Sequence, residues 1–125
     1  MKTRSWVLPL SILTLLACLA LIFFAYYPRV RTAIATTHTK FLMTQVRDIM
    51  PEGRGMKTQA DLVTFISSKR IDWNSCRLDG GEILDAWGVS MRVMFRGSAP
   101  SITLISAGPD RRFDTSDDLM ETICN

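Results

Sequence analysis

The sequence lacks most of the features that enzyme active sites use. It contains 1 histidine, His38, which excludes a histidine cluster as a metal site or catalytic centre. Neither a nucleophile motif nor a Gly-rich phosphate loop is present. Paired acids such as Asp117 and Asp118 do not make a hydrolase without a shaped pocket. We therefore expect that the protein is not an enzyme.

Concentrated positive charge is also missing. The chain has 15 Lys and Arg against 12 Asp and Glu, a net charge of +3. The basic residues are scattered, with pairs at Arg29 and Arg31, Lys69 and Arg70, and Arg111 and Arg112. Because no basic stripe with interleaved aromatic residues appears, we expect no nucleic-acid partner.

Charge is absent altogether between Trp6 and Tyr27. At about 1.5 Å per helical residue, this apolar run is about as long as a bilayer core is thick. We predict a short tail at 1–5 and a transmembrane helix at 6–27, with Tyr26 and Tyr27 at the membrane interface. The bilayer is thus the first expected partner.

Two alternatives to an anchor fit the sequence less well. A cleaved signal peptide is disfavoured because the run is long and no small-x-small site ends it. Leu15 to Cys18 faintly matches a lipoprotein box, but apolar sequence follows Cys18 where a polar linker is usual. The sequence therefore favours an uncleaved anchor.

Helical periodicity continues after the span, over 28–50. Apolar and large residues recur there at steps of three and four: Val30, Ile34, His38, Phe41, Leu42, Gln45, Val46 and Ile49. This pattern predicts an amphipathic extension whose one side packs on a domain at 51–125. We assign His38 no ligand role.

The remaining chain reads as a small α+β domain. Thr58 and Asp61 form a helix start, so we predict a second helix at 59–69. Residues 71–81 look like a loop, with Trp73 covering the core. Alternating residues predict a strand at 90–96 that forms an antiparallel hairpin with 102–106, and 119–123 could add a final strand.

An acidic loop runs from Ser106 to Leu119 and contains Asp110, Asp114, Asp117 and Asp118. Crowded carboxylates repel one another unless a cation or backbone donors compensate them, so we interpret the loop as a calcium site. The alternative is a solvated acidic turn screened by arginines. An EF-hand is excluded, because Arg112 and Thr115 occupy the positions of its third ligand and its glycine.

Cysteines are few: Cys18 in the span, and Cys76 and Cys124 beyond it. In a small domain outside the cytoplasm, such a pair predicts a disulfide that ties Cys76 to the C-terminus. The alternative is two unrelated thiols.

The C-terminal motifs resemble a known family. Asp85-Ala86-Trp87-Gly88, a hairpin, then Ser106-Ala107-Gly108-Pro109-Asp110 and Asp117-Asp118 are similar to the C-terminal domain of the major pseudopilin of type II secretion systems. The resemblance covers 85–125 well and the N-terminal half only in architecture. It implies a type IV pilin-like fold, in which a long N-terminal helix packs on a small antiparallel sheet followed by a calcium loop.

The resemblance also implies a ligand set. Asp110, Asp117 and Asp118 match the family's ligating acids, and the carbonyl groups of Ala107 and Arg112 match its main-chain ligands. Trp87 and Gly88 match a packing motif in which Ala86 replaces the usual proline. Asp114 and Ser116 have no firm counterpart.

The N-terminus departs from the family. A basic leader with a glycine cleavage site and a glutamate early in the helix are typical, whereas this sequence has Met1 to Trp6 and no glutamate before Glu52. We expect neither prepilin-peptidase cleavage nor pairing through a buried glutamate.

Together these features predict a single-pass protein of the bacterial inner membrane with a periplasmic C-terminal domain. The expected function is that of a pseudopilin-like structural or interaction protein, with pseudopilins or other secretion-system components as partners. The alternative is an autonomous calcium-dependent binding module of the cell envelope that enters no filament.

Overall fold

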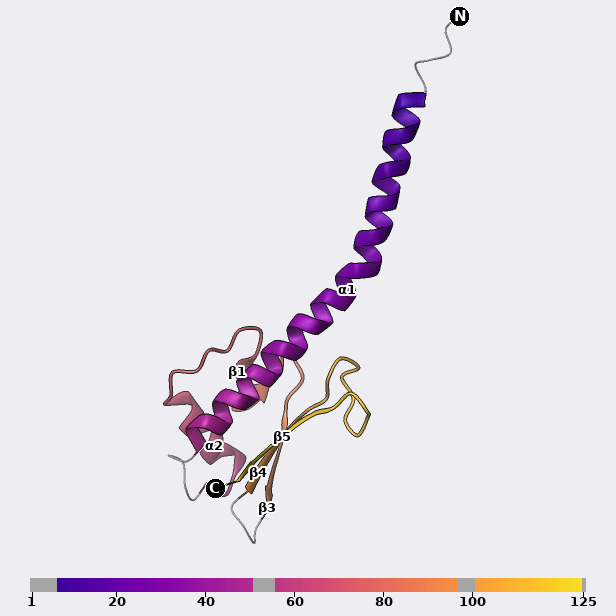
Figure 1. The fold of residues 1–125 in the computed structure, drawn as a ribbon. Coiled ribbons are helices and arrows are strands. Elements are labelled where there is room, and N and C mark those ends of the chain that lie inside the picture. The colour runs from indigo at the N-terminus through magenta and orange to yellow at the C-terminus, as the bar shows by residue number, and fades with distance from the viewer. Residues whose placement is uncertain (1–6, 51–55, 97–100, 125) are drawn as a thin grey trace, which may run out of the picture. The chain divides into compact units, whose positions relative to one another are not determined.

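The computed structural model describes residues 7–50, 56–96 and 101–124. Within these ranges the elements are α1 (Val7–Ile49), α2 (Gln59–Ser67), β1 (Arg77–Asp79), β2 (Glu82–Leu84), β3 (Arg92–Arg96), β4 (Ser101–Ser106) and β5 (Leu119–Cys124) (Figure 1). The chain divides into two compact units, Met1–Ala33 and Ile34–Asn125. The fold is α+β, with a long N-terminal helix and small antiparallel sheets, as predicted.

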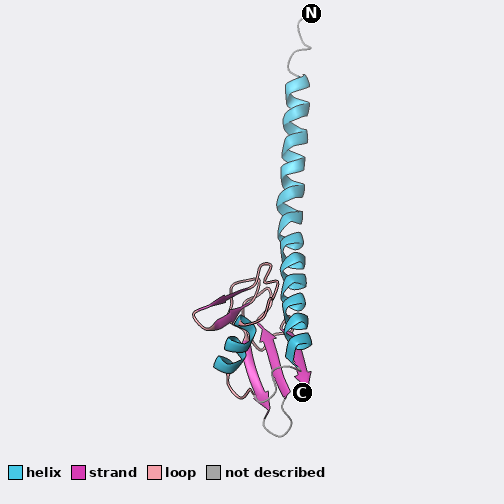
Figure 2. Ribbon diagram, turned by 90° about the vertical axis from the view of Figure 1, so that its left-hand side faces the viewer, coloured by secondary structure: helices cyan, strands magenta, loops and turns pink. Residues whose placement is uncertain are grey.

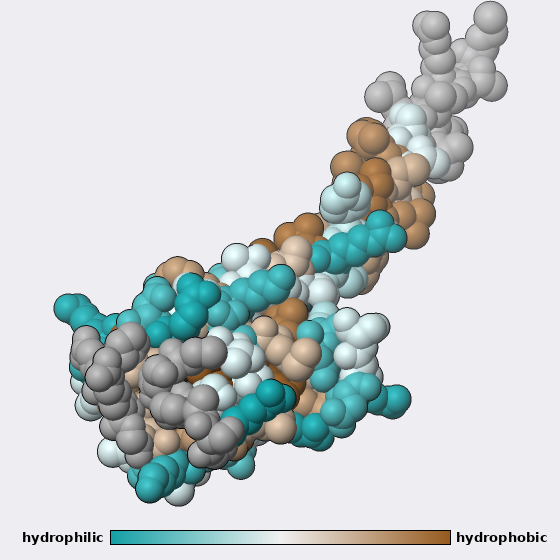
Figure 3. All heavy atoms as spheres, turned by 60° about the horizontal axis from the view of Figure 1, so that its bottom comes forward, coloured by the Kyte–Doolittle hydropathy of each residue, from teal (hydrophilic) through white to brown (hydrophobic). Residues whose placement is uncertain are grey.

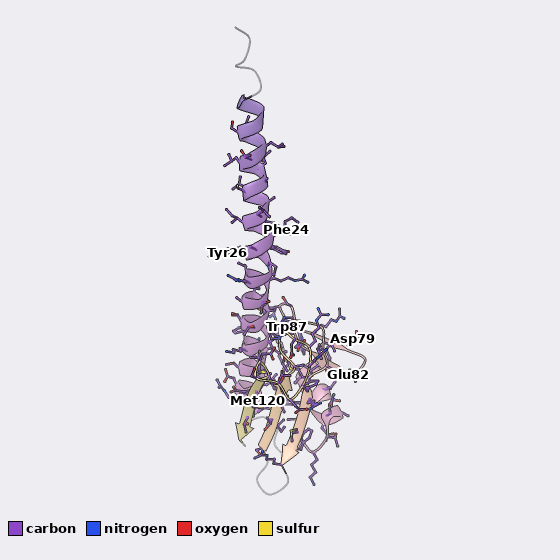
Figure 4. The ribbon with its side chains drawn as sticks, turned by 90° about the vertical axis from the view of Figure 1, so that its right-hand side faces the viewer. Phe24, Tyr26, Asp79, Glu82, Trp87 and Met120 are labelled. Atoms are coloured by element: carbon purple, nitrogen blue, oxygen red, sulfur yellow. The ribbon has the colours of Figure 1, made fainter. Side chains whose placement is uncertain are left out.

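The first unit holds the apolar part of α1. All side chains of residues 11–31 are exposed, including Phe24 at 75% and Leu21 at 70%. Figure 4 shows Phe24 and Tyr26 projecting from the helix, and Figure 3 shows apolar residues gathered along it. By length and composition this helix could cross a membrane, a property that signal sequences share. Pro28 lies inside it.

The second unit buries only part of the predicted face of α1, including Leu42 and Val46. Its buried side chains are Ala35, Thr39, Leu42, Met43, Val46 and Met50. Ile34 and Phe41 remain 49% and 47% exposed. Some of the apolar residues in the three- and four-residue pattern therefore face solvent. Thr39, which the pattern did not include, is buried.

Helix α2 begins as its sequence predicts. The Thr58 side chain accepts a hydrogen bond from the Asp61 amide, and the Asp61 carboxylate accepts one from the Thr58 amide. These bonds satisfy amide groups that the first turn leaves without helical partners. The Thr58 side chain, followed by hydrogen bonds from the Lys57 and Thr58 amides, lowers the pKa of Asp61. Leu62 and Ile66 then face the core.

The strands form two antiparallel sheets, β1-β2 and β3-β4-β5 (Figure 2). Val93 pairs with Leu104 and Leu104 with Glu121, so the predicted hairpin and final strand are confirmed. Strand β1 lies within 71–81, which the sequence predicted to be a loop. Gly80 and Gly81, with φ of 56° and 83°, make the turn between β1 and β2.

One core unites the second unit. Its buried members come from α1, α2 and both sheets: Leu42, Met43, Val46, Met50, Leu62, Ile66, Cys76, Ile83, Met91, Ile102, Leu104 and Ile123. Trp73 packs against this cluster from its edge, as predicted. The same side of β4 that faces the core ends in Ser106, which is also buried, and the acidic loop begins there.

Candidate metal-binding loop

The acidic loop, residues 107–118, connects the end of β4 to the start of β5. Gly108 is buried and has a φ of 66°, which lies in the left-handed region that favours glycine. A Cβ at this position would collide with the carbonyl group of Asp117. The two ends of the loop therefore approach each other closely only because residue 108 has no side chain.

Backbone amides contact each of the three predicted acidic ligands. The Asp110 amide donates to Asp117 Oδ2 at 3.1 Å, and the Arg112 amide donates to Asp110 Oδ1 at 2.8 Å. The Asp114 amide donates to Asp118 Oδ2 at 2.8 Å. These bonds explain how the loop holds several carboxylates at one turn, because each charge is met by a fixed dipole.

The Thr115 hydroxyl lies among three further oxygens. Its Oγ1 is 2.7 Å from Asp117 Oδ1, 3.3 Å from Asp118 Oδ1 and 3.1 Å from the Arg112 carbonyl oxygen. A hydroxyl has one proton and can donate to only one of these acceptors at a time. The remaining acceptors form an oxygen-rich, negatively charged group around this point.

Thr115 also affects the ionisation of Asp117. Its hydrogen bond is the largest cause that lowers the pKa of Asp117, and the Asp110 amide acts in the same direction. Partial burial opposes this lowering. At neutral pH the Asp117 carboxylate is therefore ionised, which is the form that a cation needs.

Arg92 on β3, rather than the loop's own arginines, makes the ion pair described for this loop. Its guanidinium is 3.1 Å from Asp114 Oδ2 and lies 4.0 Å over the Phe113 ring. Asp114 thus points to an arginine of the neighbouring strand. The ion pair with Arg92 does not involve Asp110, Asp117 or Asp118.

The predicted ligands are brought together in part. Asp117, Asp118 and the Arg112 carbonyl surround one point, and Asp110 is joined to Asp117 by a hydrogen bond. Ala107 is fully buried at the base of the loop. Among the described residues, no group of three or more His, Cys, Asp or Glu side chains stands as a ready metal cluster.

These residues nevertheless fit calcium chemically. Calcium takes carboxylate and carbonyl oxygens from flexible loops, and both kinds face the Thr115 hydroxyl. Sequence reasoning missed Thr115 as a contributor. The available signal was its position two residues before Asp117, where a hydroxyl can bond back to the carboxylate, but this pattern is common in ordinary turns.

The predicted disulfide between Cys76 and Cys124 is not formed in the structure, where Cys76 is a free, buried thiol. Its Sγ lies 3.9 Å from Thr39 Oγ1, and burial raises its pKa to about 11. The side chain of Cys124 is outside the described residues. The backbone of Cys124 pairs with Ser101 at the start of β4. The structure gives the bridge no support.

Comparison of the chain with protein-family models, with curated proteins and with solved structures finds no match in any of the three.

Proposed function

We propose that the protein is a membrane-anchored, pseudopilin-like structural or interaction protein of a type II secretion or related pilus-like system. In this proposal calcium stabilises its extracytoplasmic domain. The observation that carries the proposal is the set of oxygens from Asp117, Asp118 and Arg112 around one hydroxyl. Such a group gains stability from a bound cation, because the cation removes the mutual repulsion of the carboxylates.

Asp110, Asp117 and Asp118 would hold the calcium ion with their carboxylates, and Ala107 and Arg112 with their carbonyl groups. The bound ion would supply positive charge at the junction of the loop's two ends. Since the loop joins β4 to β5, its closure would also fix the register of these strands. Calcium would therefore act on the stability of the sheet and not on a chemical reaction.

The apolar part of α1 supports the anchor. Its side chains between residues 11 and 31 are exposed to solvent all around the helix, which is costly in water and favourable in a bilayer. We place the anchor in a bacterial inner membrane and the domain in the periplasm. The partners in this proposal are the bilayer and pseudopilins or other secretion-system components.

A second candidate function is an autonomous calcium-dependent binding module of the cell envelope. The loop supports it equally, because a cation-stabilised domain needs no filament. Co-purification of the full chain with filament subunits from membranes separates the two functions. Recovery of such subunits favours the first candidate, and their absence under conditions that retain other envelope proteins favours the second.

Calcium dependence itself is tested by the thermal midpoint of the full chain in detergent, measured with calcium, magnesium or chelator. At about a hundredfold excess over Kd, a bound ion stabilises the folded state by about 2.7 kcal/mol, or several degrees in a small domain. Asp117→Ala should lose most of the calcium response and change little in chelator. Asp79→Ala, at an exposed acid of the β1-β2 hairpin, is the matched control (Figure 4).

A rise with calcium that magnesium does not reproduce supports the proposal. An equal midpoint in all three solutions would contradict it.

A further inference from the structure

A buried carboxylate lies next to the base of the loop. Asp85 is 1% exposed, and its Oδ1 accepts hydrogen bonds from the amides of Trp87 at 3.0 Å and Val89 at 2.9 Å. Its Oδ2 accepts a hydrogen bond from Ser106 Oγ at 2.6 Å. Burying a carboxylate costs on the order of several kcal/mol unless hydrogen-bond donors compensate its charge. The contacts therefore fix Asp85 in one orientation.

Ser106 extends this contact to the loop. Because its hydroxyl proton points to Asp85, its oxygen can accept from the Gly108 amide, 3.2 Å away. Gly108 is the residue that approaches the Asp117 carbonyl group. The carboxylate of Asp85 thus orients the hydroxyl that holds the point where the two ends of the loop meet.

The other side of Asp85 leads to helix α1. The amide of the next residue, Ala86, donates to Thr39 Oγ1 at 3.2 Å. Thr39 is fully buried on α1. Hydrogen bonds therefore tie the turn at 85–89 to Thr39 through the Ala86 amide and to Ser106 through the Asp85 carboxylate.

We propose that Asp85 and Ser106 are positioning residues for the metal-binding loop. They hold Gly108 so that Asp110 and Asp117 meet, and they join the loop to the packing surface of α1. This inference rests on the proposed calcium function, but it also makes a claim about the loop without metal: the Gly108 amide is held by the orientation of Ser106.

The first variants are Asp85→Asn and Ser106→Ala in the full chain in detergent. Asp85→Asn keeps the size of the side chain but replaces the acceptor that faces Ser106 with an amide. Ser106→Ala removes one oxygen and serves where Asp85→Asn does not fold. Removal of supporting hydrogen bonds around a metal site lowers metal affinity by about 10- to 100-fold, so we expect a calcium Kd that rises by about this factor.

Two readouts separate positioning from a general loss of stability. The first is hydrogen exchange of the Gly108 amide in chelator, measured by NMR, which should become faster in both variants while the amides of α2 stay protected. The second is the calcium Kd of the double variant. It should be no higher than the higher Kd of the two single variants, because both changes break the same hydrogen bond between Asp85 and Ser106. Asp79→Asn, which removes a carboxylate charge at an exposed position, should change neither quantity.

The outcomes distinguish this inference from the proposed function. A wild-type chain that binds calcium, with variants that keep its Kd and its Gly108 exchange rate, would overturn the positioning role alone. A wild-type chain that does not bind calcium would overturn the proposed function. The Gly108 exchange rate in chelator would then still decide whether Asp85 and Ser106 hold the loop.

Discussion

The two parts of helix α1 differ in what surrounds their apolar side chains. In the first, residues 11–31 are exposed on every side. In the second, Leu42 and Val46 are 1% and 0% exposed, and the outward positions include Arg47 and Asp48. One continuous helix thus presents exposed apolar side chains over one part and packs into a protein interior over the other. This comparison predicts which substitutions each part tolerates.

The largest effect is expected from a cavity in the second part. Leu42→Ala should destabilise the domain by about 2–5 kcal/mol, because it removes buried methyl groups and leaves a void. Leu21→Ala, at a residue 70% exposed in the first part, should leave the denaturation midpoint unchanged. Equal midpoint losses in chemical denaturation would break the comparison.

Introducing a charge should affect the first part of α1 more than the second. Leu19→Arg places a guanidinium in the middle of the apolar run, at a cost to membrane insertion of about 2.5–3.5 kcal/mol. Phe41→Arg changes a residue of similar exposure in the second part, 47% against 53% for Leu19, and should leave the membrane-bound fraction intact. Fractionation of membranes measures both. Full membrane retention of Leu19→Arg would contradict the anchor.

At Gly108, two effects of adding a side chain can be separated: the collision with the other end of the loop and the strain of a positive φ. Gly108→Ala should cost about 1–3 kcal/mol for strain in the left-handed region, and it should also force the loop apart at Asp117. Gly80→Ala has the same sign of φ, but a Cβ there meets nothing within 4 Å. We expect a larger drop in thermal midpoint for Gly108→Ala, and similar drops would argue against the close approach.

The thiol of Cys76 tests how tightly the second unit is packed. Its pKa of about 11 and its burial predict very slow alkylation of a Cys18→Ser/Cys124→Ser variant at pH 8, and rapid alkylation after unfolding. Mass spectrometry follows both. For the wild type, a mass that rises by two protons on reduction would instead show that a bridge to Cys124 exists.

The smallest effect concerns Asp117. Its pKa is lowered in the folded state, so its contribution to stability is present above the unfolded pKa and is lost as the pH falls through the folded value. Thr115→Val removes the main cause and should raise this pKa towards its ordinary value. Carboxylate chemical shifts in an NMR titration measure the change, and an unaltered titration would show that Thr115 has no such role.

Local patterns in the sequence were sufficient to predict the local structure. The capping residues Thr58 and Asp61 predicted the start of α2, and alternation predicted β3, because these signals depend on neighbouring residues. The β1-β2 hairpin was missed since three-residue strands carry too few alternations to be seen.

Contacts between distant residues could not be predicted in this way. Asp85 and Ser106 are 21 positions apart, and Thr39 and Ala86 are 47 apart. Only the packing of α1 and the sheet brings them together. The predicted pairing of Cys76 with Cys124 has a related weakness: a count of cysteines says nothing about how far apart two thiols lie in the fold, and Cys76 is a free thiol in the structure.

The most direct test of the central claim is a calorimetric titration of the full chain in detergent with calcium, beside Asp117→Asn. The account predicts binding of about one calcium ion per chain, and loss of most of the affinity in the variant. A wild-type chain that shows no binding would contradict the claim that the loop is a calcium site. The acids would then be a solvated turn held by its own amides.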